Sequence, residues 1–166
     1  MDDTSLKHEP TRAADFKELK ITSSAFPEDG LIPSQYTCDG RNISPPLAIE
    51  HIPEEARSLV LVVEDPDAPR GTWLHWMVWD IPVTHHIKEN EIHGVQGKND
   101  FGDFNYGGPC PPSGTHRYFF KVYALDTILN LPQNTAKADL EKSMADNILA
   151  FGELIGRYKR IITMHA

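Results

Sequence analysis

The apolar residues of this chain, from about residue 19 onwards, form short runs that predict β-strands. Ser58 to Glu64 reads SLVLVVE, an almost continuous apolar run that is typical of a strand buried on both faces. Leu19 to Ser24, Trp73 to Ile81 and Arg117 to Leu125 are the other clear strands. Each run is bounded by proline, glycine, asparagine or aspartate, which interrupt strands. The pattern therefore predicts an all-β fold.

Near the C-terminus the spacing of apolar residues changes from that of strands to that of a helix. Thr135 is a suitable N-cap, and the pattern predicts an amphipathic helix over about Ala136 to Asn147. The apolar residues that define this helix recur at every fourth position: Ala136, Leu140, Met144 and Ile148. The segment Ile148 to Ile162 fits either a helix or a strand, and we favour a strand because two glycines weaken a helix. We expect one or two short helices near the C-terminus.

The length of the chain favours one domain. At 166 residues it can bury one sizeable core, whereas two separate cores would each be marginal. Residues 1–18 are polar and show no period, so we expect a flexible extension there. We expect a single domain over residues 19–166.

The charge of the chain argues against several classes of partner. The formal net charge is −8, and the sequence has no block of five lysines and arginines that would bind nucleic acid or an anionic membrane surface. No apolar run approaches the roughly 18 residues of a transmembrane helix. The first twenty residues are rich in charge where a signal peptide needs an apolar run. We therefore expect no nucleic acid partner, no integral membrane segment and a cytoplasmic location.

The two cysteines, Cys38 and Cys110, are too few for a fold framed by disulfides, and they lack the CxxC spacing of a structural zinc site. A disulfide between them requires Cα atoms within about 7 Å, and a reducing cytoplasm disfavours it. We expect two free thiols.

The first segment that suggests a binding site is DPDAP, residues 65–69, directly after the most apolar strand. Two prolines cannot continue a central strand, so the chain leaves the sheet here and places Asp65 and Asp67 at its edge. An aspartate in such a turn can also bond only its own loop amides. For Asp67 the two interpretations are evenly matched, and for Asp65 we favour the site.

Two further segments carry histidines. His75 lies in WLHW, residues 73–76, and a single histidine among aromatic residues is more often a packed core group than a ligand. Residues 107–118, GGPCPPSGTHRY, combine glycines that admit close backbone approach with His116 and Tyr118 on one face of the following strand. Arg117 points to the other face.

Together these segments suit a small phosphate, phosphonate or carboxylate, because every group except the aspartate can donate a hydrogen bond. Asp65 would hold a histidine in its charged form. Asp65, His75 and His116 also contain the parts of a hydrolase centre, but no G-x-S-x-G motif presents Ser113 or any other serine as a nucleophile. The spacing H-x-x-x-H or H-x-H of a metal site is absent, as are nucleotide-binding glycine motifs. We expect no metal and no cofactor, and a binding protein rather than an enzyme.

In the order DPDAP, WLHW, GGPCPP and SGTHRY, these motifs resemble the signature of the phosphatidylethanolamine-binding protein family. The likeness extends to YTCDG at residues 36–40, NISPP at residues 42–46 and LIG at residues 154–156, and so covers about residues 19 to 160. These outer segments are similar to those of the bacterial and archaeal, Raf-kinase-inhibitor-like branch.

The resemblance implies a β-sandwich built on a large central antiparallel sheet, with an anion pocket at one end. It assigns Arg117 a structural pairing below the pocket. It also implies a possible protein partner such as a kinase or a protease, and a homodimer. The extra C-terminal helix of the mammalian members has no counterpart here. The ligand-binding residues that the motif positions imply are Asp65, Asp67, His75, Gly108, Pro111, His116 and Tyr118.

Overall fold

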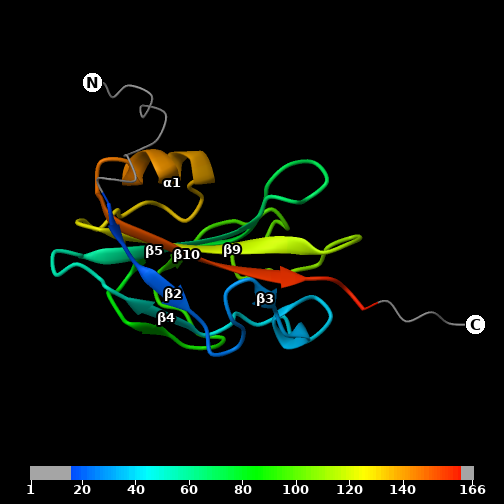
Figure 1. Ribbon diagram of the computed structural model, residues 1–166. Coiled ribbons are helices and arrows are strands. Elements are labelled where there is room, and N and C mark those ends of the chain that lie inside the picture. The colour runs from blue at the N-terminus through cyan, green and yellow to red at the C-terminus, as the bar shows by residue number, and fades with distance from the viewer. Residues whose placement is uncertain (1–15, 162–166) are drawn as a thin grey trace, which may run out of the picture.

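The computed structural model describes residues 16–161 and consists mainly of β-strands (Figure 1). Within this range, seven strands form one large sheet. Its path is β1-β10-β9-β5-β6-β8, and β3 pairs with the outer edge of β10. The strands are β1 (Lys17–Glu18), β3 (Gly30–Leu31), β5 (Ser58–Asp65), β6 (Trp73–Ile81), β8 (Val95–Gln96), β9 (His116–Leu125) and β10 (Ile148–Tyr158).

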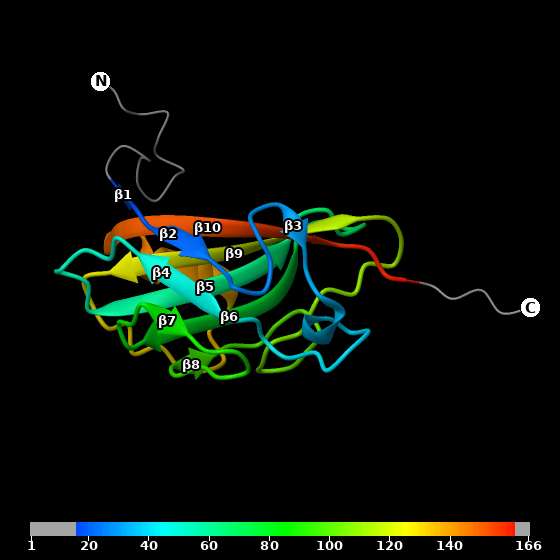
Figure 2. The ribbon, with the colours of Figure 1, turned by 60° about the horizontal axis from the view of Figure 1, so that its bottom comes forward.

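The centre of the large sheet is antiparallel, as the sequence predicts. β10, β9, β5 and β6 pair antiparallel, whereas β1 and β3 pair parallel with β10 (Figure 2). Every residue of β5 is buried. Leu61 on one face of β5 and Val62 on the other belong to two separate hydrophobic clusters. This is why the apolar run of β5 is almost continuous: both faces of the strand are covered.

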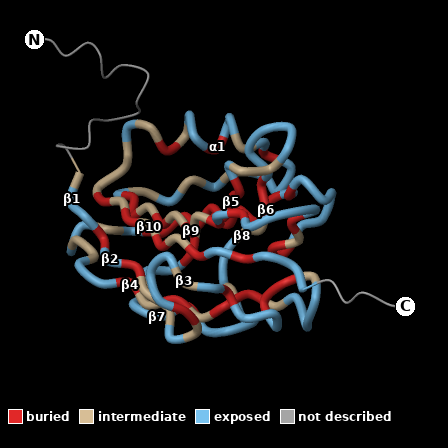
Figure 3. Tube along the Cα trace, turned by 45° about the vertical axis from the view of Figure 1, so that its right-hand side comes forward, coloured by how far each residue is buried: buried red, intermediate tan, exposed pale blue. Residues whose placement is uncertain are grey.

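A second, three-stranded sheet covers one face of the large sheet and completes the sandwich. Its order is β2 (Lys20–Thr22), β4 (Leu47–Glu50) and β7 (His86–Ile87). Ile21, Ile49 and Ile87 from this sheet pack in one cluster with Leu61 and Phe120 from the large sheet. Buried residues run along the strands, while the connecting loops are mostly exposed (Figure 3).

A single α-helix of the described chain, α1 (Lys137–Met144), lies on the opposite face of the large sheet (Figure 1). Leu140 and Met144 pack there against Val60 and Val62. The helix is shorter than its apolar spacing predicts, and the Thr135 hydroxyl donates to the carbonyl of Pro132 instead of capping the helix. The segment after the helix forms β10, which confirms the prediction of a strand. A short 3-10 turn, η3 (Ser34–Tyr36), precedes the loop that reaches the site.

The N-terminal boundary differs from the sequence prediction. Lys17 and Glu18 pair with Ala150 and Phe151, so ordered structure begins before residue 19. The rest of the predicted extension, residues 1–15, lies outside the described residues. No helix within residues 16–161 has the length and apolar character needed to cross a membrane.

Candidate functional site

The ends of three central strands meet at one edge of the large sheet. Asp65 ends β5 opposite Trp73, the first residue of β6. His116 begins β9, which runs antiparallel to β5. Antiparallel pairing thus brings the end of one strand beside the beginnings of its two neighbours. The three motif segments predicted from sequence therefore meet in space.

A cavity of about 230 Å³ lies at this edge. Its walls combine aromatic rings and prolines with a few polar groups, a composition typical of ligand sites. The residues that line it are Asp65, Ala68, Pro69, Trp73, His75, Phe101, Cys110, Pro111, Pro112, His116 and Tyr118. A wider hollow of about 770 Å³ lies along β1, β2 and β10, and its lining mixes both signs of charge, with two lysines and three glutamates. Only the smaller cavity gathers buried polar groups on one point, so it is the candidate site.

Asp65 and His116 form a buried pair at the base of the cavity. The Nδ1 atom of His116 lies 2.6 Å from Oδ2 of Asp65, and both side chains are almost fully buried. The other carboxylate oxygen accepts a hydrogen bond of 2.7 Å from the Asp67 amide. An ionised carboxylate only accepts, so the proton of this pair lies on Nδ1 of His116. Nε2 of His116 is then the ring atom available to a ligand.

His75 is held differently from His116. Its Nδ1 lies 2.6 Å from the carbonyl oxygen of Gly107, which can only accept, so Nδ1 carries a proton. Burial lowers the pKa of His75, and the bond to Gly107 and the charge of Asp65 only partly oppose this effect. His75 is therefore neutral at pH 7, and its Nε2 is an acceptor. We expected Asp65 to favour a charged histidine, and the structure pairs it with His116.

The hydroxyl of Tyr118 is the third polar group of the site. It is fully buried and has no hydrogen-bond partner within the described chain. Burial and the negative charge of Asp65 raise the pKa of Tyr118, so the hydroxyl keeps its proton. The ring stands edge-on to His75, with centroids 5.3 Å apart, and stacks on His116 at 6.5 Å. An unpartnered buried donor is costly unless a ligand or water satisfies it.

Asp67 and Arg117 lie beside the cavity rather than in its wall. Arg117 donates to Asp67 from its backbone amide, from Nε and from Nη2, at 2.9, 3.0 and 2.9 Å. Hydrogen bonds from Arg117 lower the pKa of Asp67 to about 2, against a smaller opposing effect of burial. The guanidinium thus pairs with a carboxylate that the motif had placed in the pocket.

Gly108 supports the wall without lining the cavity. Its amide donates to Oδ1 of Asn42 at 2.8 Å, and a Cβ at this position would collide with the Tyr36 carbonyl. Glycine is required here because two loops pack backbone against backbone. Pro111 does line the cavity, as the motif implies.

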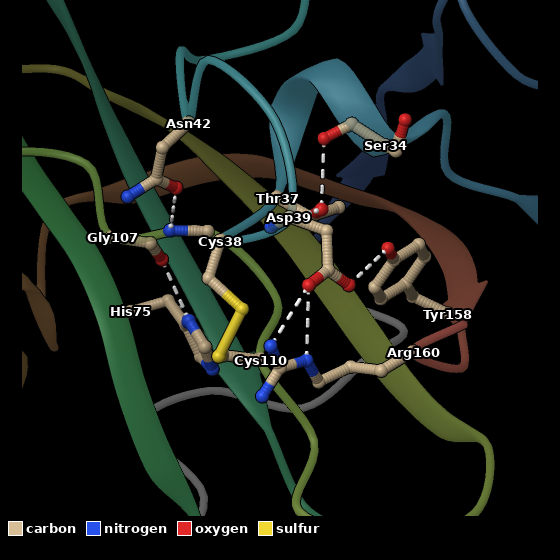
Figure 4. The surroundings of a disulfide bond; sticks show 11 residues. Ser34, Thr37, Cys38, Asp39, Asn42, His75, Gly107, Cys110, Tyr158 and Arg160 are labelled. Atoms are coloured by element: carbon tan, nitrogen blue, oxygen red, sulfur yellow. Dashed lines mark hydrogen bonds and ion pairs between the residues drawn. A yellow bond between two sulfur atoms is a disulfide. The ribbon is translucent and has the colours of Figure 1, made fainter. Parts of the chain in front are cut away.

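The prediction of free thiols is wrong: Cys38 and Cys110 form a disulfide, with Cα atoms 5.4 Å apart (Figure 4). The Cys38 amide also donates to the carbonyl of Pro109 at 3.1 Å. In the sequence, the small number of cysteines and the expected cytoplasmic location favoured free thiols. The fold decides otherwise because it packs two loops together that lie 72 residues apart in sequence. Cys110 lines the cavity, so the cross-link fixes its wall.

Sequence reasoning missed the aromatic rim of the cavity. Trp73 and Phe101 contact each other edge to face, with centroids 5.5 Å apart, and both are partly exposed. Phe101 also contacts the ring of His75 at 5.3 Å. The available signal was the pair of phenylalanines within the polar loop NDFGDFN, residues 99–105, because large apolar side chains gathered at the surface often mark a binding site.

The geometry gives no support to the hydrolase interpretation. Ser113 and Thr115, the two hydroxyl residues that the hydrolase interpretation needs, do not line the cavity. No group of three histidines, cysteines or acidic residues suited to a metal ion occurs within residues 16–161.

Comparison with known proteins identifies the relatives of this chain. The family model described as phosphatidylethanolamine-binding protein matches residues 22–159. A UPF0098 protein from Pyrococcus abyssi is 49% identical over 155 residues, covering 87% of each chain. A UPF0098 protein from Methanothermobacter thermautotrophicus is 46% identical and covers 86% of this chain and 99% of its own.

Solved structures agree with these relatives. The crystal structure of CT736 from Chlamydia trachomatis, described as a homologue of the same family, superposes with a TM-score of 0.84 at 42% identity, covering 87% of this chain and 99% of that one. YbcL from E. coli superposes with a TM-score of 0.80 at 32% identity, covering 87% and 100%. A carboxypeptidase Y inhibitor solved with its cognate proteinase shares the fold alone, with a TM-score of 0.52 at 15% identity and coverage of 87% and 83%.

Proposed function

The chain belongs to the phosphatidylethanolamine-binding protein family, and we propose that it binds a small anion, a phosphate, phosphoryl group or carboxylate, in the cavity at the ends of β5, β6 and β9. One observation carries the proposal. The Tyr118 hydroxyl is a buried proton donor at the cavity with no partner in the described chain. An anion would accept a hydrogen bond from it, and Nε2 of His116 is available at the same cavity.

Isothermal titration with inorganic phosphate tests this proposal. Tyr118→Phe removes the unpartnered donor and keeps the ring, so the affinity should fall by about tenfold to a hundredfold, as expected for a hydrogen bond to a charged group. Tyr123→Phe is the matched control, because it makes the same change in β9 at a residue outside the cavity. Equal loss in both variants, or none in Tyr118→Phe, would count against the proposal.

We predict that the affinity of the site for an anion depends on pH. An anion that accepts from a charged histidine of the cavity should bind more tightly at about pH 5.5 than at about pH 8. Sulfate is the suitable probe because its own charge is constant there. His116→Asn should flatten the profile, whereas a flat profile in the wild type would assign the anion to neutral donors.

A protein partner is the second candidate, favoured by the exposed aromatic residues beside the cavity. Trp73, Phe101 and Phe104 each expose more than a third of their surface, and exposed aromatics are typical anchors of interfaces. A kinase or a protease is the predicted class of partner. Pull-down with the wild type and with Phe101→Ser distinguishes this candidate from a free anion. A protein partner that binds through the exposed aromatic residues should be recovered with the wild type and lost with the variant.

Two further predictions concern assembly and compartment. We predict a homodimer, which light scattering across a tenfold dilution tests. A cytoplasmic location is retained as a prediction, and the disulfide sharpens its test, because disulfides are uncommon in reducing cytoplasm. Rapid alkylation of thiols in the source cells shows whether Cys38 and Cys110 are bonded there.

A further inference from the structure

The two histidines of the cavity offer different hydrogen-bonding groups to a ligand. Nδ1 of His75 donates to the Gly107 carbonyl at 2.6 Å, and that oxygen has no proton to give in return. Whether His75 is neutral or charged, Nδ1 keeps its proton. The state of Nε2 therefore decides whether His75 donates to a ligand or accepts from it.

The carbonyl of Gly107 is fixed in place by its own loop. The Gly107 amide donates to the carbonyl of His75 at 3.0 Å, so the two residues hold each other through two bonds. The next residue, Gly108, donates to Asn42, and Cys110 is cross-linked to Cys38 (Figure 4). The loop cannot turn this carbonyl away without breaking these contacts, so the tautomer of His75 is set by the backbone.

The surroundings of His75 keep Nε2 without a proton. The ring is 3% exposed and lies edge-on to Tyr118 and Phe101. Burial lowers its pKa, and the opposing charges of Asp65 and Asp100 do not reverse this.

The two carboxylates near His75 accept hydrogen bonds from other groups. Asp65 bonds His116 and the Asp67 amide, while Asp100 accepts from the Leu74 amide at 2.7 Å. His116 is the other histidine at the cavity, and its Nδ1 bonds Asp65. His75 thus presents a lone pair at the same cavity as the Tyr118 hydroxyl, which is a donor without a partner in the described chain.

From this geometry we infer that the cavity selects anions that carry a proton of their own. Hydrogen phosphate, a phosphonate monoanion or a phosphomonoester monoanion has a P–O–H group that can donate to Nε2 of His75 while its other oxygens accept from Tyr118 and His116. Sulfonates and phosphodiesters have acceptor oxygens only. When they bind, a lone pair of a ligand oxygen faces the lone pair on Nε2 of His75. The inference rests on the proposed anion site and names its ligand class.

Methylphosphonate and methanesulfonate form a matched pair of probes. At a mildly acidic pH both are tetrahedral monoanions with a methyl group and three oxygens, but only the phosphonate bears a proton. Calorimetric titration of the wild type should show methylphosphonate binding at least about tenfold more tightly, because the sulfonate leaves a buried acceptor unsatisfied. Methyl phosphate, which bears a proton, should bind about as tightly as methylphosphonate. Dimethyl phosphate, which bears none, should bind about as weakly as methanesulfonate.

The outcomes separate this inference from the proposed function. Equal affinities, or tighter binding of the sulfonate, overturn the inference but leave the anion site in place. If none of the four probes binds, the proposed function fails and the inference fails with it. His75→Phe should abolish the preference while methanesulfonate still binds through Tyr118 and His116.

A direct measurement does not depend on any variant. NMR of protein labelled with ¹⁵N-histidine should show Nε2 of His75 unprotonated in the free protein, with the proton on Nδ1. Added methylphosphonate should shift that Nε2 signal towards the position of a hydrogen-bonded acceptor. A proton found on Nε2 of the free protein at neutral pH would overturn the inference.

Discussion

Glu64 and Asp65 are consecutive buried carboxylates whose surroundings differ in kind. They end β5 and point to opposite faces of the central sheet, because side chains alternate along a strand. Glu64 is 8% exposed and Asp65 is 3% exposed. Burial of a carboxylate therefore does not explain why one of them lies at a cavity and the other does not.

Glu64 has partners for both of its oxygens. The Nζ atoms of Lys121 and Lys137 lie 2.7 and 2.9 Å from Oε2 and Oε1. Burial alone would raise the pKa of Glu64, but the hydrogen bonds and charges of the two lysines lower it by more. Lys137 begins α1, so the network ties the helix to the sheet. Both oxygens are held in ion pairs, and Glu64 does not line the cavity.

Asp65 has a histidine as its partner. Nδ1 of His116 lies 2.6 Å from Oδ2 of Asp65, and no salt bridge joins Asp65 to a lysine or an arginine within the described residues. The Tyr118 hydroxyl, at the same cavity as Asp65, has no hydrogen-bond partner within the described residues. The difference teaches that a buried carboxylate held by two lysines ties elements of the fold together, whereas one held by a histidine at a cavity marks a candidate site.

The largest expected effect comes from the cross-link on the Asp65 side. The double variant Cys38→Ser, Cys110→Ser should lower the free energy of unfolding by about 2 to 4 kcal/mol, since a disulfide between distant residues restricts the unfolded chain. It should also weaken the preference for methylphosphonate, because the Gly107 loop loses an anchor. Urea denaturation and titration measure the two effects, with the reduced wild type as control. Stability unchanged by the double variant would show that the loops hold without the bond.

Glu64→Gln tests the opposite face of the central sheet, where Glu64 pairs with two lysines. It leaves Lys121 and Lys137 close together without their anion, and the free energy of unfolding should fall by about 2 to 3 kcal/mol, less than for a fully buried pair because the lysines are partly exposed. Phosphate affinity should remain within about twofold. Urea denaturation and titration check both parts. A large loss of affinity would mean that the two faces are coupled.

Asp65→Asn should lower the affinity for the anion, which Glu64→Gln should leave nearly unchanged. The asparagine can still accept from Nδ1 of His116 but no longer favours its charged form, so sulfate affinity at acidic pH should fall by about tenfold. Stability should also fall, by about 1 to 2 kcal/mol, because asparagine has one acceptor oxygen where Asp65 accepts from both His116 and the Asp67 amide. Titration of the variant against pH should give a flat profile, as expected for His116→Asn. A profile like that of the wild type would remove Asp65 from the charged-histidine mechanism.

The smallest effect is expected at Asp67, the carboxylate beside the cavity. Its pKa in the folded protein is lowered to about 2, chiefly by Arg117, so its contribution to stability is present above the ordinary aspartate pKa and is lost as the pH falls towards that value. The pair is well exposed, so the contribution is small. Asp67→Asn should flatten this acid limb of the stability profile in urea denaturation and leave sulfate binding unchanged. A clear loss of sulfate affinity would return Asp67 to the site.

The sequence by itself determined the long central strands and the residues that meet at the cavity. A strand covered on both faces needs a nearly continuous apolar run, which is why β5 was recognisable, and Pro66 and Pro69 require the chain to leave the sheet directly after it. Of the seven residues that the motifs assigned to the pocket, Asp65, His75, Pro111, His116 and Tyr118 line the cavity. These properties follow from local chemistry and periodicity, which the order of residues contains directly.

Only the tertiary structure decided which groups pair. Asp65 meets His116 across 51 residues of sequence, and Cys38 meets Cys110 across 72. Asp67 takes Arg117, while the Gly107 carbonyl sets the tautomer of His75. Strand register and the packing of loops fix these distances, and residue types alone do not encode them. The sequence therefore places two histidines beside one cavity, and the fold gives the Nδ1 atom of each ring a different partner, the Gly107 carbonyl for His75 and Asp65 for His116.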